Sequence, residues 1–127
     1  MSLARCAVSC VLVLLAGCAA ISTADGDRLA LQSEEFRVYV ERVFREQNRV
    51  ADELAFALEA PEPARAELAV AEQRLLEACA AVNELATARR DELRLGLRRS
   101  LSAARTVPRC EQTTRSVAEA LDGARAQ

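Results

Sequence analysis

Histidine, lysine and tryptophan are missing from this 127-residue sequence, and all 17 of its basic residues are arginine. Without imidazole or lysine, the chain lacks side chains often used for proton transfer, metal binding and Schiff-base chemistry. It also shows no glycine-rich loop, no metal-ligand cluster and no nucleophile beside a base. We therefore expect a protein that is not an enzyme and that needs no metal or soluble cofactor.

Glycine, proline and aromatic residues are also scarce, with 4 glycines, 3 prolines and 3% aromatics. Few residues are thus available to interrupt a helix, and the default expectation is long helices. Hydrophobic residues make up 51% of the chain, which excludes a disordered composition. The net charge of −2 excludes the strongly basic balance of a nucleic-acid binder. The length suits one domain.

The first 18 residues form a distinct segment. Arg5 is followed by an apolar run, residues 6–16, which is too short to cross a bilayer but fits a secretory signal peptide. The run ends in Leu15-Ala16-Gly17-Cys18, and these four residues resemble the lipobox of bacterial prolipoproteins. The alternative interpretation is an uncleaved signal anchor or an ordinary signal peptide.

The resemblance implies cleavage between Gly17 and Cys18, with residues 1–17 removed. It also implies a thioether-linked diacylglycerol and an N-acyl chain such as palmitate on Cys18. Two or three acyl chains make release from a membrane very slow. In enterobacterial relatives an aspartate after the cysteine favours the inner membrane, so Ala19 points to the periplasmic face of the outer membrane. Residues 18–27, small and polar, are expected to form a lipidated tether.

The rest of the chain, residues 28–127, reads as a single helical domain. Apolar residues recur at alternating steps of three and four, which is typical of a helix with one buried face. The first helix is expected over residues 28–59 and ends before Pro61 and Pro63. Its predicted inward residues are Phe36, Tyr39, Val40, Val43, Phe44, Gln47, Val50, Leu54, Ala57 and Leu58.

Two arrangements of the remaining residues compete. A single helix could run from Pro63 to Arg105, or the chain could turn near Gly96. The turn predicts helices over residues 63–94 and 97–125, and hence an antiparallel three-helix bundle or long helical hairpin. Pro108 then predicts a bend or break at residues 105–108. The predicted inward residues are Leu68, Ala71, Leu75, Ala78, Cys79, Val82, Leu85 and Ala86, followed by Leu97, Leu101, Ala104, Val107, Cys110, Thr114, Val117 and Leu121.

Two cysteines remain after maturation, Cys79 and Cys110, in a compartment that would be oxidising. Their midpoint lies within two residues of Gly96, so a turn there places them face to face. A continuous helix to Arg105 would keep them too far apart for a disulfide. If the two cysteines pair, the turn is the correct arrangement. The alternative is two unpaired buried thiols.

Arginines gather around the expected turn, whereas acidic residues dominate residues 46–84. In an up-down-up bundle this turn lies at the lipidated end of the molecule. We therefore expect a basic patch facing phospholipid headgroups, with solvated surface pairs such as Glu111 and Arg115 as the alternative. The patch consists of Arg89, Arg90, Arg94, Arg98 and Arg99.

These features predict a membrane-anchored periplasmic lipoprotein that acts as a structural or adaptor component of the bacterial envelope and contacts a protein partner. A second hypothesis is a small module that binds an apolar ligand or lipid in a cavity lined by Phe36, Phe44 and Leu54. A third is an accessory subunit of an envelope enzyme. An exposed apolar stripe would favour the adaptor.

Overall fold

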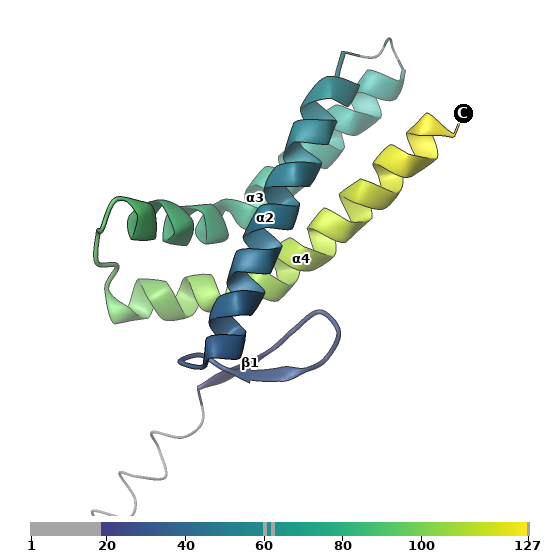
Figure 1. Cartoon of the computed structure of the whole chain (residues 1–127). Helices are drawn as coiled ribbons and strands as arrows, with labels where there is room; N and C mark the ends of the chain where they lie inside the picture. The colour runs from purple at the N-terminus through teal and green to yellow at the C-terminus, as the bar shows by residue number, and fades with distance from the viewer. Residues whose placement is uncertain (1–18, 60, 62, 127) are drawn as a thin grey trace, which may run out of the picture.

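Most of the described chain is helical. The computed structural model describes residues 19–59, 61 and 63–126, and in that part a short β-hairpin precedes three long helices (Figure 1). Successive helices run in opposite directions, so the predicted all-α antiparallel three-helix fold is confirmed. The elements are β1 Ala20–Ser22, β2 Arg28–Ala30, α2 Glu34–Ala57, α3 Ala64–Arg90 and α4 Leu97–Arg125.

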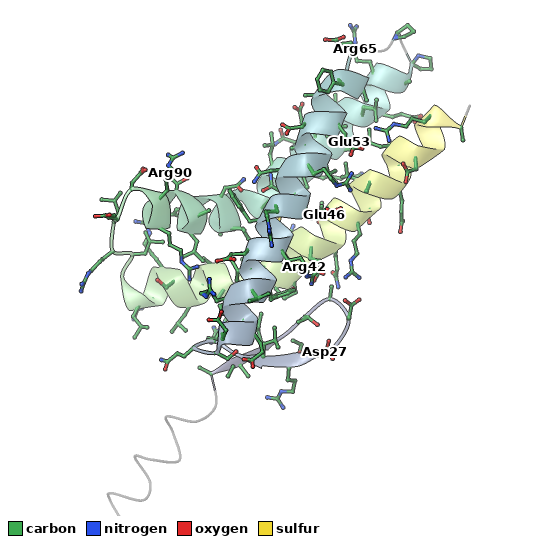
Figure 2. The ribbon with its side chains drawn as sticks, in the orientation of Figure 1. Asp27, Arg42, Glu46, Glu53, Arg65 and Arg90 are labelled. Carbon is green, nitrogen blue, oxygen red and sulfur yellow. A yellow bond between two sulfur atoms is a disulfide. The ribbon has the colours of Figure 1, made fainter. Side chains whose placement is uncertain are left out.

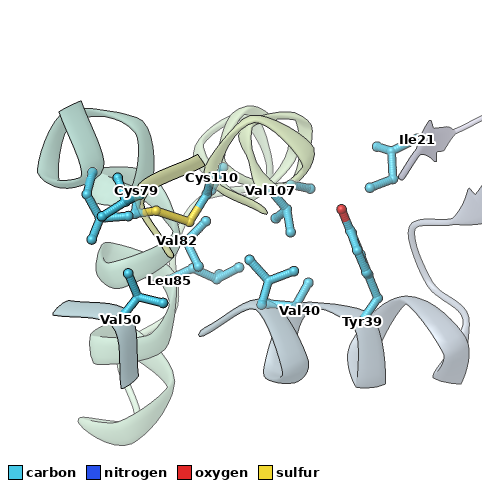
Figure 3. Packing of buried hydrophobic residues seen from close by; sticks show 14 of the residues in the cluster. Ile21, Tyr39, Val40, Val50, Cys79, Val82, Leu85, Val107 and Cys110 are labelled. Carbon is cyan, nitrogen blue, oxygen red and sulfur yellow. A yellow bond between two sulfur atoms is a disulfide. The ribbon is translucent and has the colours of Figure 1, made fainter. Parts of the chain in front are cut away.

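The hairpin corrects the expectation for the start of the domain. Part of the expected tether, residues 18–27, and the expected start of the first helix at residue 28 instead form the antiparallel strands β1 and β2, in which Ala20 pairs with Ala30. Ile21 points into the protein and is buried (Figure 3). The helix begins at Glu34 because the hydroxyl of Ser33 accepts a hydrogen bond from the Phe36 N–H at 3.1 Å. Cys18 and the preceding residues lie outside the described part.

The core lies where the apolar repeats meet. The inward faces predicted for the three helices are largely confirmed, and Gln47 is buried as its place on the stripe requires. Figure 3 shows how side chains from all three helices and from β1 fill this core. Its most deeply buried aliphatic side chains are Val43, Val50, Leu54, Leu75, Val82, Val107 and Leu121.

The turn between α3 and α4 confirms one of the two competing arrangements. The single helix to Arg105 was wrong, because α3 already ends at Arg90. The end is held by two hydrogen bonds that reverse the chain, from the Leu93 N–H to Ala88 O at 2.8 Å and from the Glu92 N–H to Arg89 O at 3.3 Å. Glu92 takes the left-handed conformation usual for glycine at this position, with φ 56°. Gly96 instead precedes the first turn of α4.

The α3–α4 pair changes direction along its length and carries its connecting loop away from α2 (Figure 1). In α4 the predicted bend is confirmed, but the helix does not break at Pro108. Proline has no N–H to donate to the carbonyl four residues earlier, so one helical hydrogen bond is lost there. Because α2 does not cover the diverging arm, Leu97, predicted to point inward, is 75% exposed.

The predicted disulfide is present. Cys79 and Cys110 are bonded across α3 and α4, with their Cα atoms 4.7 Å apart and both side chains completely buried (Figure 3). The bond closes a loop of 31 residues in sequence separation that contains the whole α3–α4 turn. It therefore ties the two helices together between the turn and their opposite ends.

We predict that replacing both cysteines by alanine lowers the free energy of unfolding by about 4 kcal/mol, because loop-closure entropy is returned to the unfolded chain. Urea unfolding followed by far-UV circular dichroism measures this change. Wild-type protein in reductant should lose stability in the same direction. An unchanged unfolding midpoint in both samples would show that the bond contributes no stability.

Candidate membrane-facing site

The five arginines predicted to form a basic patch lie together at the end of the α3–α4 pair, in residues 89–99, which we call the elbow. All five are exposed. Two of them form ion pairs, Arg90 with Asp91 and Arg99 with Glu84, each at 3.0 Å. Within the described part of the chain, the other three have no ion pair. The elbow is thus a cationic surface that its own acidic residues only partly neutralise.

Exposed leucines accompany these arginines. Leu93 is 65% exposed and Leu97 is 75% exposed, on either side of the reversal of the chain. Large apolar side chains beside arginines are typical of segments that lie in the interface of a bilayer. In the described residues, none of the helices has the length and apolar content needed to cross a membrane.

An apolar groove of about 300 Å³ runs along the inner side of the elbow. Its lining comes from α2, α3, α4, the loop between α3 and α4, and the N-terminal segment, and we call it the elbow groove. Polar contributions to its lining come from Arg89, Ser100 and Gln32. Its large apolar lining side chains are Leu31, Phe36, Leu85, Leu93, Leu97 and Leu101.

Ala19, the first described residue, also lines the elbow groove. It is held there because the Leu31 N–H donates a hydrogen bond to its carbonyl at 3.0 Å, which extends the pairing of β1 with β2. The start of the described chain and the basic patch therefore lie at the same end of the molecule. The sequence predicted this juxtaposition from topology, and in the structure Ala19 and one arginine of the patch, Arg89, line the same groove.

The opposite end of the molecule has a different surface. Arg65 and Arg90 mark the two ends of α3 in Figure 2. Near Arg65, Phe56 is 77% exposed and borders a second hollow together with Leu68 and Leu121. An ion pair between Glu53 and Arg125, at 2.9 Å, joins α2 to α4 at this end.

A buried carboxylate holds the hairpin and the helices together. Glu111 of α4 has only 4% of its side chain exposed, yet three donors reach it. The Tyr39 hydroxyl donates at 2.8 Å, Arg42 at 2.9 Å and Arg115 at 2.7 Å. Arg115 also donates two hydrogen bonds to Asp25 in the hairpin turn, at 2.7 and 2.8 Å. One carboxylate thus links α4 to α2 and, through Arg115, to the hairpin.

The protonation of this cluster follows from its contacts. Burial acts to raise the pKa of Glu111, but the hydrogen bonds from Tyr39 and Arg42 and the charges of Arg42 and Arg115 outweigh it, so the pKa is lowered. Burial and the hydrogen bond to Glu111 raise the pKa of Tyr39. The hydrogen bond from Arg115 lowers the pKa of Asp25. Glu111 and Asp25 are therefore ionised at neutral pH, whereas Tyr39 stays protonated and donates its hydrogen bond to Glu111.

The interpretation of Glu111 and Arg115 as a solvated surface pair was wrong for Glu111. The sequence did carry a signal, because Glu111 follows Val107 by four residues and precedes Thr114 by three, on the buried stripe of α4. A charged residue on an inward face requires partners from other elements. In the described residues, no group of three or more histidine, cysteine, aspartate or glutamate side chains is placed to hold a metal ion.

We predict that Glu111→Gln lowers the free energy of unfolding at pH 7 by about 2–3 kcal/mol, since the variant loses the negative charge and one of the two acceptor oxygens that Tyr39, Arg42 and Arg115 share. A carboxylate whose pKa is lowered by folding stabilises the protein above its unfolded pKa. That contribution is lost as the pH falls through the folded pKa, which lies below the ordinary value of 4.5. The difference between variant and wild type should therefore shrink in acid.

Glu41→Gln is the matched control, because Glu41 is exposed and, among the described residues, forms its ion pair with Arg37 on the same helix. Its stability should stay close to that of the wild type. Urea unfolding at several pH values measures all three proteins. A loss of stability in Glu111→Gln that is no larger than in Glu41→Gln would contradict the role assigned to the buried carboxylate.

Comparison with known proteins assigns no family. No protein-family model, curated protein or solved structure matches the chain.

Proposed function

We propose that the mature protein is a lipid-anchored, non-catalytic adaptor of the bacterial envelope that rests on the membrane through its elbow. The single observation that carries the proposal is the position of Ala19. This residue follows the expected lipidation site, Cys18, and lines the same groove as the elbow residues Arg89 and Leu93. The lipid anchor and the basic, leucine-bearing surface then act on the same membrane.

Charge and apolar surface both favour this orientation. Each arginine near an anionic membrane surface contributes about 1 kcal/mol of attraction. Leu93 and Leu97 lie between the arginines, where they can enter the headgroup region. The resemblance of residues 15–18 to a lipobox, with Ala19 after the cysteine, supports the periplasmic face of the outer membrane.

The end near Phe56 would then face away from the membrane, toward a protein partner in the envelope. Phe56 has 77% of its surface exposed and adjoins the apolar side chains of Ala57 and Leu68, and an exposed apolar patch is typical of a protein contact site. This end also contains the hollow bordered by Leu68 and Leu121. An adaptor needs such a surface, whereas a membrane tether alone does not.

The elbow groove supports a second candidate, the binding of an apolar ligand. The enclosed cavity expected between Phe36, Phe44 and Leu54 is not the site that the structure offers, because Leu54 is packed in the core. Phe36 instead contributes to the open elbow groove. A ligand in this groove would touch both the N-terminal segment and the elbow.

The anchor itself predicts a defined mass. Protein purified from membranes of its native host should begin at Cys18 and carry the mass of diacylglycerol and one further acyl chain. In a Cys18→Ser variant this mass should disappear, because serine offers no thiol for the thioether bond. Intact-mass spectrometry of the two proteins gives the answer. Wild-type protein that begins at Met1, or whose Cys18 carries no acyl mass, would refute the anchor.

Orientation and partner can be tested together with one photoreactive amino acid placed at position 56 or position 97. Phe56 and Leu97 have nearly equal exposure, 77% and 75%, so they form a matched pair. After illumination of intact cells, we expect protein adducts from position 56 and lipid adducts from position 97. Electrophoresis and mass spectrometry distinguish the two kinds of product.

A further pair of substitutions checks the role of charge. Arg94→Gln with Arg98→Gln should reduce the lipid adducts at position 97 and leave the products at position 56 unchanged, because attraction to anionic lipid acts only at the elbow. Lipid adducts at both positions, or protein adducts at neither, would contradict the proposed orientation and the adaptor role.

A further inference from the structure

The start of the described chain is held in place at the elbow groove. Ala19 lines the groove and is fixed by the hydrogen bond from the Leu31 N–H, and strand β1 begins at the next residue. Cys18 is bonded directly to Ala19, and consecutive Cα atoms are 3.8 Å apart across a trans peptide bond. Any group bonded to the sulfur of Cys18 is therefore only a few covalent bonds away from Ala19, a residue of the groove wall.

The groove has the surface that a hydrocarbon chain requires. Phe36 and Leu85 form buried parts of its wall, and Leu101 is half-buried. Leu93 and Leu97 flank it with most of their surface exposed. Its volume of about 300 Å³ lies at the lower end of the range of small-molecule sites, which suits part of one acyl chain.

The polar residues of the lining are cationic or neutral. Arg89 contributes to the wall, and Ser100 and Gln32 are the other polar contributors. A guanidinium can donate hydrogen bonds to the ester carbonyls that join acyl chains to glycerol. In the described residues, acidic side chains do not line the groove. The lining of the groove therefore suits an apolar chain whose polar end accepts hydrogen bonds.

We infer that the elbow groove holds one of the acyl chains attached to Cys18. This inference rests on the proposed lipid anchor and extends it, since it names where one chain lies. The remaining chains would enter the bilayer beside Leu93 and Leu97. A chain held in this way fixes the elbow against the membrane, whereas a flexible linker would let the domain rotate freely.

The test uses the whole protein in its native membranes. Cells are supplied with a fatty acid carrying a photoreactive diazirine, illuminated, and the purified protein is digested with trypsin, which cleaves after arginine. Cys18 then lies in a peptide that ends at Arg28. We expect this peptide to be joined through its acyl chain to groove peptides of the same molecule, residues 29–37, 95–98 or 100–105.

Two serines of α4 give a matched pair of variants. Ser100 lines the groove, while Ser102 is exposed on the same helix outside it. Ser100→Trp should fill the groove, and the intramolecular adducts should be lost. Ser102→Trp introduces the same side chain and should leave the adducts at the wild-type level. Far-UV circular dichroism of both variants confirms that each remains folded.

The outcomes separate this inference from the proposed function. Absence of acyl mass on Cys18 would refute the anchor and the inference together. Acylated Cys18 whose adducts lie only on phospholipid, or on other proteins, would overturn the inference and leave the anchor intact. Mixing ¹⁴N- and ¹⁵N-labelled protein identifies adducts between two copies, which would also overturn it. Adducts in wild type that persist unchanged in Ser100→Trp would place the chain outside the groove.

Discussion

The covalent bond between Cys79 and Cys110 sets the register of α3 against α4, and the rest of the arrangement depends on that register. On one side of the bond the two helices continue toward the elbow. On the other side they continue beside α2 toward the end near Phe56. Sliding one helix past the other by a single turn would move a whole row of side chains out of the core. The bond excludes such a shift and so keeps the elbow leucines and arginines in a fixed relation to the N-terminal segment.

Much of this fold could be predicted because the apolar residues on the buried face of a helix recur every three or four positions in the sequence. The stripe from Phe36 to Leu54 identified the inward face of α2, and the spacing of two cysteines around Gly96 identified the turn. The hairpin could not be predicted in the same way. Strands of three residues contain too few alternations to be distinguished from a loop, and only Ile21 among them is buried. Leu97 was misassigned because periodicity does not reveal where a neighbouring helix stops covering a face.

The candidate site was predictable only in part. Charge segregation pointed to the five elbow arginines, since their number in a short segment is a property of the sequence alone. The groove needs contributions from segments far apart in the chain, such as Ala19, Leu85 and Leu101, so its existence depends on tertiary packing. The same holds for Glu111, whose partners Tyr39 and Arg42 lie about 70 positions earlier.

The hairpin also determines how the molecule would respond to tension. If the protein is held at Cys18, a mechanical load enters through β1 and reaches first the bond between Ala19 and Leu31. An antiparallel ladder pulled from its open end gives way one hydrogen bond at a time. The hydrogen bonds from Arg115 to Asp25, at the closed end of the hairpin, would bear the load last. The hairpin would therefore unfold first and lengthen the chain between Cys18 and α2, while the disulfide-linked helices α3 and α4 stay folded.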